Sequence, residues 1–307
     1  MKKIIIILVG LIPAILFAQQ FPFFEGYNIN PYSLNPAYAG IHKSKTIFMD
    51  YRSDWSGLEG GPVTYQLSYN DRFKNNVGLG GKFIYDKTDI FKQTLILGTY
   101  TYKVSITKGH LIHFGLSAGM YRNSVDLSKY YNNPDYVQDL VLFSGTAQSK
   151  IKLATDISAL YRVEKTEVGI LFSNIMFGSA KYSKSSISYK PLKNFQIHAS
   201  QIFNLSNRIS FNPIIILRGG QSIPTQIEIA PSVILNKRLW ANVLYRSGGI
   251  IGAGFGGEVY KGLMFNYSYN MSSNVDMNTF GSHQITIGVG IFKNSASNKA
   301  PQDLRNN

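Results

Sequence analysis

The sequence of 307 residues contains no cysteine, which excludes disulfide bonds, catalytic thiols and thiolate metal sites. Its internal part also contains no apolar run of the roughly 18 residues that a membrane-spanning helix requires. Acidic residues are scarce, with 17 Asp and Glu against 31 Lys and Arg. The basic residues lie singly in turns and loops and form no patch, so we expect no nucleic-acid partner. Anionic lipid headgroups or an acidic protein partner fit this charge better.

Aromatic residues and glycine are abundant: 20 Tyr, 19 Phe and 28 Gly favour β-strands and tight turns over helices. In residues 62–70, which read P-V-T-Y-Q-L-S-Y-N, apolar residues alternate with uncharged polar ones, and the pattern returns as far as residues 285–291. Successive side chains of a strand point to opposite faces, so each strand has one apolar and one polar face. A soluble β-sandwich or a barrel with a lipid-facing outside and a wet inside would both produce this pattern.

The N-terminus is typical of a secretory signal peptide. Lys2 and Lys3 precede an apolar run from Ile4 to Phe17, and the small residue Ala18 follows. We expect cleavage after Ala18, which makes residues 1–18 the signal peptide. No cysteine follows the apolar run, so the mature chain is not expected to be a lipoprotein. An exported chain without disulfides must draw its stability from the sheet, and a closed barrel does so because every strand edge is paired.

From residue 45 to residue 293 the pattern predicts about 14 antiparallel strands. Their centres lie near Met49, Tyr65, Leu79, Leu97, Phe114, Leu153, Ile170, Ile197, Phe211, Ile229, Val243, Phe255, Phe265 and Ile287. Two regions are ambiguous: the glycine-rich stretch 248–257, and the connection 122–149, which is long enough to contain a further hairpin. Residues 294–307 are polar and predicted to be a disordered periplasmic tail.

The connections between these strands alternate in length. One set is short, and each member carries a Lys or Arg: 71–76, 107–110, 163–166, 205–208, 236–237 and 260–262. The alternate set is mostly longer: 53–61, 86–93, 122–149, 175–189, 218–225, 246–249 and 271–282. Short periplasmic turns alternating with longer outer loops are typical of outer-membrane barrels, whereas a sandwich has no reason to sort its loops in this way. We therefore predict an all-β, transmembrane outer-membrane antiparallel β-barrel.

Residues 19–44 precede the first strand and are rich in Asn, Pro and Tyr. We expect this segment to be irregular in backbone and to lie either in the periplasm or inside the barrel. Its residues Asn35, Pro36, Tyr38 and Gly40 have two possible roles. They could form a docking element or an internal plug. They could equally form a turn that steers the chain into the barrel wall, a use to which Asn, Pro and Gly are well suited.

Four stretches of the sequence, which occur in the same order as in the family, resemble the PorP/SprF family of outer-membrane proteins of the type IX secretion system of Bacteroidetes. They are N-P-Y-S-L-N-P-A-Y-A-G at 30–40, Y-R-S-D-W-S-G-L-E-G-G-P at 51–62, V-G-L-G-G-K-F-I-Y-D-K at 77–87 and L-S-A-G-M-Y-R-N-S-V-D-L at 116–127. The C-terminal half matches only as a string of strands. Gly61 departs mildly from the family, which usually has Ala before the Pro.

The resemblance implies an outer-membrane protein that works with the type IX translocon. Family members are thought to bind the C-terminal secretion domain of a cargo protein, often a large adhesin, and to help export it or hold it at the surface. The resemblance also implies a link to a periplasmic peptidoglycan-binding protein. The alternative function is a passive porin or small-solute channel.

The first outer loop supplies further candidate partner-binding residues: Arg52, Trp55, Gly57, Gly60, Gly61 and Pro62. If Tyr51 faces lipid, Arg52 points into the lumen. There it could bind an acidic cargo tail, but pairing with a carboxylate of the lumen is the more common arrangement. Trp55 is expected in the outer aromatic girdle.

Catalysis is poorly supported, and we predict neither an enzyme nor a cofactor or metal site. The five histidines are His42, His110, His113, His198 and His283. His110 and His113 would point to opposite sides of a strand, and adjacent Ser282 and His283 also point apart, which is wrong for a nucleophile and its base. The stretch G-A-G-F-G-G at 252–257 lacks the helix that a phosphate-binding loop requires.

Overall fold

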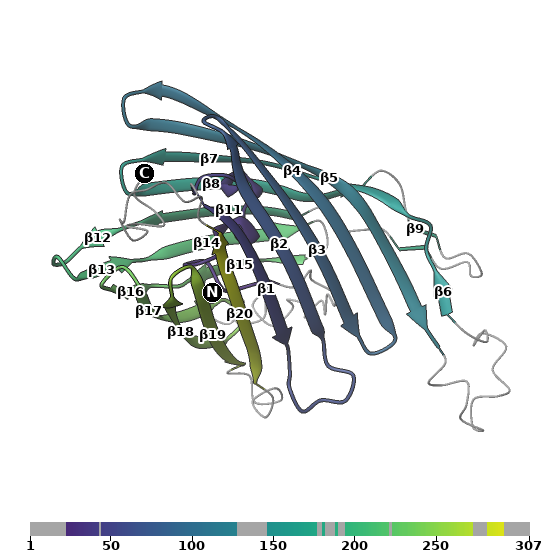
Figure 1. The fold of residues 1–307 in the computed structure, drawn as a ribbon. Coiled ribbons are helices and arrows are strands. Elements are labelled where there is room, and N and C mark those ends of the chain that lie inside the picture. The colour runs from purple at the N-terminus through teal and green to yellow at the C-terminus, as the bar shows by residue number, and fades with distance from the viewer. Residues whose placement is uncertain are drawn as a thin grey trace, which may run out of the picture.

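The fold is described from a computed structural model, which describes residues 23–42, 44–127, 146–176, 180–181, 188–189, 194–220, 223–272 and 281–291. Its main sheet is a closed barrel of 14 antiparallel crossings (Figure 1). Closure is made by β1 (Lys45–Ser53), which pairs on one side with β2 (Val63–Lys74) and on the other with β20 (Ser282–Ile291). Tyr51, for example, lies opposite both Tyr65 and Ile285.

The remaining strands of the wall follow in chain order. They are β3 (Val77–Thr88), β4 (Phe91–Thr107), β5 (His110–Asp126), β6 (Thr146–Gln148), β7 (Lys152–Val163), β8 (Thr166–Met176), β11 (Asn194–Gln201), β12 (Phe203–Asn204), β13 (Ile209–Asn212), β14 (Ile214–Gly220), β15 (Ile223–Ile229), β16 (Ser232–Leu235), β17 (Leu239–Arg246), β18 (Ile250–Tyr260) and β19 (Leu263–Ser272). A separate two-stranded sheet joins β9 (Ala180–Lys181) to β10 (Ser188–Tyr189).

Some crossings are made of two short strands. Pro213 separates β13 from β14, and Pro231 separates β15 from β16. Proline has no backbone N–H to donate, so the ladder is interrupted at both points although the crossing continues. Every strand centre predicted from the sequence falls within one of these crossings, and the predicted all-β barrel is confirmed.

The two faces of the wall differ as the alternation predicts. On β1, Ile47 and Met49 are exposed to the outside, whereas Asp50 is buried in the lumen. The outer face carries large apolar and aromatic side chains, which a hydrocarbon environment favours, and the buried inner face is mainly polar. Tyr51 and Tyr65 pack together on the outside with ring centroids 5.3 Å apart.

The connections also follow the sequence pattern. The short turns that join β4 to β5 and β18 to β19 contain Gly109 and Gly262, both at positive φ. The stretch 252–257 lies within β18, with no helix after it. In the long connection 122–149, β5 continues to Asp126 and β6 pairs with its end, while residues 128–145 lie outside the described residues. None of the helices among the described residues is long and apolar enough to span a membrane.

Residues 23–42, which precede β1, lie inside the barrel. They contain two short helical turns, α2 (Pro31–Leu34) and η1 (Pro36–Tyr38), which are drawn in purple within the wall (Figure 1). We call residues 23–42 the plug. Three clusters of buried apolar residues join the plug to the wall, and they involve Tyr27 and Leu34, Tyr32 and Ala37, and Ile29. Tyr32 is 1% exposed and Ala37 is fully buried, so the plug forms part of the core.

Candidate functional site

The plug contacts strands on all sides of the lumen. Near its middle, Asn30 donates to Ser68 of β2, and the Tyr32 hydroxyl lies 2.7 Å from the Thr99 hydroxyl of β4. On the other side, the carbonyl of Leu34 accepts a hydrogen bond of 2.8 Å from Gln196 of β11. These strands lie far apart around the barrel, so the plug crosses the lumen and does not merely line one wall.

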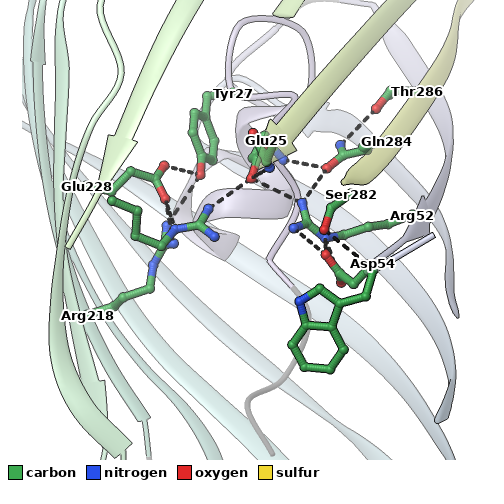
Figure 2. Close-up of polar contacts among 12 residues, drawn as sticks. Glu25, Tyr27, Arg52, Asp54, Arg218, Glu228, Ser282, Gln284 and Thr286 are labelled. Carbon is green, nitrogen blue, oxygen red and sulfur yellow. Dashed lines mark hydrogen bonds and ion pairs between the residues drawn. The ribbon is translucent and has the colours of Figure 1, made fainter. Parts of the chain in front are cut away.

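A network of buried charges holds the outer end of the plug (Figure 2). Glu25 is 5% exposed, and its Oε1 accepts from Arg52 of β1 at 3.1 Å, from Arg246 of β17 at 2.9 Å and from Asn270 of β19 at 2.6 Å. The backbone N–H of Glu25 donates to Gln284 of β20. Buried charges are tolerated only when they are paired and hydrogen-bonded, and Glu25 meets this condition through four strand residues.

The same network continues across the lumen through Glu228 of β15, which is fully buried. Its Oε2 accepts from Arg246 at 2.7 Å and from Arg218 of β14 at 2.9 Å. The hydroxyl of Tyr27 donates to Oε1 at 2.5 Å. The guanidinium of Arg218 also lies over the ring of Phe23, 4.1 Å from its centroid. The N-terminal segment therefore joins carboxylates and arginines that come from distant strands.

Arg52 has two carboxylate partners. Besides Glu25 it donates to Asp54, with Nη2 2.7 Å from Oδ1. The prediction that this inward arginine pairs with a carboxylate agrees with these contacts, and one partner comes from the plug. A role of Arg52 in binding a cargo protein stays a prediction.

The predicted residues of the plug lie at its periplasmic end. Asn35 caps η1, since its Oδ1 accepts from the N–H of Ala37 at 2.8 Å and Pro36 occupies the first position of the turn. The Asn35 amide also donates to the carbonyl of Ile170 and lies 3.2 Å from Nε2 of His198. The Tyr38 hydroxyl donates to Glu167 of β8.

Gly40 is required where it stands. It has φ +71, and a Cβ at this position would lie 2.5 Å from the Cα of Gly78. The carbonyl of Gly40 accepts a hydrogen bond from Nε of Arg72, which also donates to the carbonyl of Ile41. The carbonyl of Ala39 accepts from Thr101. The glycine thus allows the plug backbone to lie directly against β3, where it meets the periplasmic ends of β2 and β4.

The residues predicted in the first outer loop form a compact structure at the other end of the lumen. The N–H of Asp54 donates to the carbonyl of Pro62 at 2.9 Å, and the N–H of Asp89 donates to the carbonyl of Gly60. Gly57 and Gly60 have positive φ, and so does the partly exposed Trp55. The N–H of Gly61 donates to the carbonyl of Leu58 within the same loop.

This loop also contacts the connection before β20, because Ser56 donates to the carbonyl of Gly281. The structure therefore brings Arg52, Trp55, Gly60 and Pro62 together at the outer mouth. It places them at the opposite end of the lumen from Asn35–Gly40, so the two predicted groups do not form one site.

Sequence reasoning missed the residues that carry the charge network. They are Glu25, Tyr27, Arg218, Glu228, Arg246 and Asn270. Three of these residues could have been found from the sequence. Arg218, Glu228 and Arg246 are charged residues at inward positions of strands that are otherwise apolar or uncharged, and such charges need a partner. Glu25 could not have been found in this way, because the segment around it has no periodic pattern that assigns its side chain to a face.

The histidines are dispersed. His283 lies 2.8 Å from the Tyr267 hydroxyl, whereas the neighbouring Ser282 accepts from the N–H of Trp55. His110 contacts Tyr161. Among the described residues no group of three or more His, Cys, Asp or Glu is placed to hold a metal ion.

Comparison with known proteins links the chain to one family. The family model described as type IX secretion system membrane protein PorP/SprF matches residues 16–289. A search of curated protein sequences gives no match. Among solved structures, the toluene transporter TbuX of Ralstonia pickettii has 9% identity and a TM-score of 0.49, with 89% of this chain and 94% of that chain covered. The outer membrane protein Omp33 of Acinetobacter baumannii has 6% identity and a TM-score of 0.49, with 82% of this chain and 100% of that chain covered.

Proposed function

Since the chain belongs to the PorP/SprF family of type IX secretion system membrane proteins, we propose that it receives an exported cargo protein at the outer membrane. The cargo, of the adhesin type, binds through its C-terminal secretion domain, and the barrel helps to export it or anchors it at the surface. The partners in this proposal are the type IX translocon, the cargo and a periplasmic peptidoglycan-binding protein. The barrel fold and the family place the chain itself in the outer membrane.

The plug is the observation that carries this proposal. A channel for small solutes needs an open lumen, but here the chain's own residues 23–42 cross the lumen and are buried in it. The buried ion pairs that join Glu25 of the plug to Arg52 and Arg246 of the wall would be costly to separate, so the plug is expected to stay in place. A barrel closed in this way is better suited to docking a protein than to passing solutes.

The outer mouth offers a surface for such docking. The loop from Asp54 to Pro62 is fixed by its own hydrogen bonds and by contacts to Asp89 and Gly281. Elsewhere the lumen retains a cavity of about 110 Å³ between the plug and strands that include β4, β8, β11 and β14. Its lining combines apolar side chains with charged ones, and includes Leu95, Leu97, Lys82, Asp156 and Arg218.

The proposal is tested by purifying the barrel from outer membranes and identifying what copurifies. We expect a cargo protein and a periplasmic protein in stoichiometric amounts. Deletion of the gene should remove a specific adhesin from the cell surface while general type IX secretion continues. Copurification of lipid alone, with unchanged surface adhesins, would contradict the proposal.

The competing function is a passive porin or small-solute channel. Conductance of the purified barrel in planar bilayers separates the two functions. A plugged receptor should give no steady current without cargo, whereas a porin should give a steady open pore. A persistent conductance in the wild-type barrel would favour the porin.

A further inference from the structure

A small basic cavity lies where the plug meets the periplasmic ends of β2, β3, β4 and β5. Its volume of about 10 Å³ is close to the minimum for one water molecule, so it admits a single oxygen of a larger group. Ala39 and Gly40 of the plug form one side. The other side carries the side chains of Arg72, Lys74, Asn75, Asn76, Lys103 and His113. No carboxylate is found among the described residues that line this cavity.

The donors around this cavity are not all used within the chain. Arg72 donates from Nε and Nη2 to the carbonyls of Gly40 and Ile41, which are neutral acceptors, and no carboxylate of the described residues pairs with it. Lys103 makes no ion pair with any residue that the structure describes. His113 is 5% exposed, and its Nε2 has no hydrogen-bond partner within the described chain. Unsatisfied buried donors and unpaired cations are costly, so this end of the lumen is suited to an acceptor of negative charge.

We propose that this cavity binds one carboxylate group that a periplasmic polypeptide presents to the barrel. A carboxylate accepts several hydrogen bonds at once. Arg72 and Lys103 offer charged donors, and His113 offers a third donor in the tautomer that carries its proton on Nε2. The inward direction of these side chains makes the site reachable from the periplasm and not from the lipid around the barrel.

The surroundings favour a polypeptide over a free ion. The turns on the same rim also carry Lys108, Lys165, Arg208, Lys237 and Lys261. This excess of positive charge over Glu164 and Glu258 of the same rim complements an extended acidic surface, of which the bound carboxylate would be the deepest group. The inference rests on the proposed function, because it names the chemistry by which a periplasmic partner would recognise this barrel.

The site is tested first with acetate as the probe. The full-length barrel, purified in detergent with ¹³C-labelled histidine, is titrated with acetate at constant ionic strength, with chloride as the exchanged anion. We expect the His113 resonance to shift and saturate. Lys103→Gln should weaken acetate binding by about tenfold, since it removes one charge-assisted contact. Lys103→Arg should retain binding, and the control Lys87→Gln, at an exposed position near the outer end of β3, should leave it unchanged.

The partner is tested in cells with a photo-crosslinking residue at position 76, on the rim of the cavity. We expect crosslinks to a periplasmic protein through a peptide that contains Asp or Glu, lost in Lys103→Gln and kept in Lys87→Gln. Absence of a saturable shift with acetate, or equal effects of the two lysine variants, would overturn the site. Acetate binding with crosslinks that Lys103→Gln leaves unchanged would overturn the assignment to a polypeptide. Surface adhesin, measured in parallel, tests the proposed function separately.

Discussion

At the outer end of the plug Glu25 is held by buried ion pairs, whereas Asn35–Gly40, at the periplasmic end, carry no charge of their own and are held by hydrogen bonds and close backbone contacts. At the outer end the buried charges share partners, so the loss of one removes an ion pair from each of its neighbours. At the periplasmic end the fit depends on shape. The two ends should therefore respond differently to substitution, the first to charge and the second to added atoms.

The largest effect is expected for Glu25→Gln. The substitution keeps the size of the side chain but removes the negative charge between Arg52 and Arg246. Arg52 keeps Asp54 and Arg246 keeps Glu228, so the loss should lie near the lower end of the cost of breaking a buried ion pair, at about 3 kcal/mol. The free energy of unfolding of the barrel in detergent, from urea titration, measures this loss. We also expect the plug to be released more often, which should appear as conductance in planar bilayers.

The matched control is Glu164→Gln, which makes the same change at an exposed residue of the turn between β7 and β8. Its effect should be within about 0.5 kcal/mol. If Glu25→Gln is no more destabilising than this control, the charge network does not hold the plug.

Gly40→Ala tests the dependence on shape at the other end. Positive φ and a Cβ placed 2.5 Å from the Cα of Gly78 should together cost about 2–3 kcal/mol. Gly109→Ala is the control, because Gly109 has φ +85 but nothing within 4 Å of the added atom. It should cost only about 1 kcal/mol, and the difference between the two thermal unfolding shifts measures the close contact with β3. Equal shifts would mean that the plug does not press against the wall here.

The difference between the two ends also explains what could be predicted from the sequence. The strands, their inward and outward faces and the barrel follow from alternation along single strands, which is a local pattern. The sequence could suggest a glycine with positive φ at residue 40, because the backbone angle is a local property. It could not predict the close contact of the Gly40 backbone with Gly78, because this contact depends on the tertiary fold.

The charge network could not be predicted, because its partners are distant in the sequence. Glu25 is 221 residues from Arg246 and 245 from Asn270. Only closure of the barrel brings such residues together, and a plug without periodic pattern gives no register from which to infer its contacts. Inward charges such as Glu228 show that a partner is needed, but not which residue supplies it.

Asn35→Ala should have an intermediate effect. It removes the cap of η1 and the hydrogen bond to the carbonyl of Ile170, which together contribute about 1–2 kcal/mol. The same substitution at Asn207, exposed in the turn between β12 and β13, is the control and should be nearly neutral. Urea unfolding of both variants provides the comparison. A neutral result for Asn35→Ala would show that wall contacts alone fix η1.

The smallest effect is expected for Tyr27→Phe, which removes one hydroxyl from the charged end and should cost about 1 kcal/mol at neutral pH. Burial, and then the neighbouring Glu228 carboxylate, raise the pKa of Tyr27 above its usual range, so the folded protein keeps the phenol protonated. In the unfolded chain tyrosine ionises near pH 10, so the stability contributed by the neutral hydroxyl is complete below about pH 10 and declines above it. The difference in unfolding free energy between wild type and Tyr27→Phe should therefore be constant up to about pH 9 and decrease at higher pH. If the difference in unfolding free energy instead decreases at low pH, the Tyr27 hydroxyl stabilises the fold only while the Glu228 carboxylate is ionised. Burial of the hydroxyl would then not be the cause of its contribution.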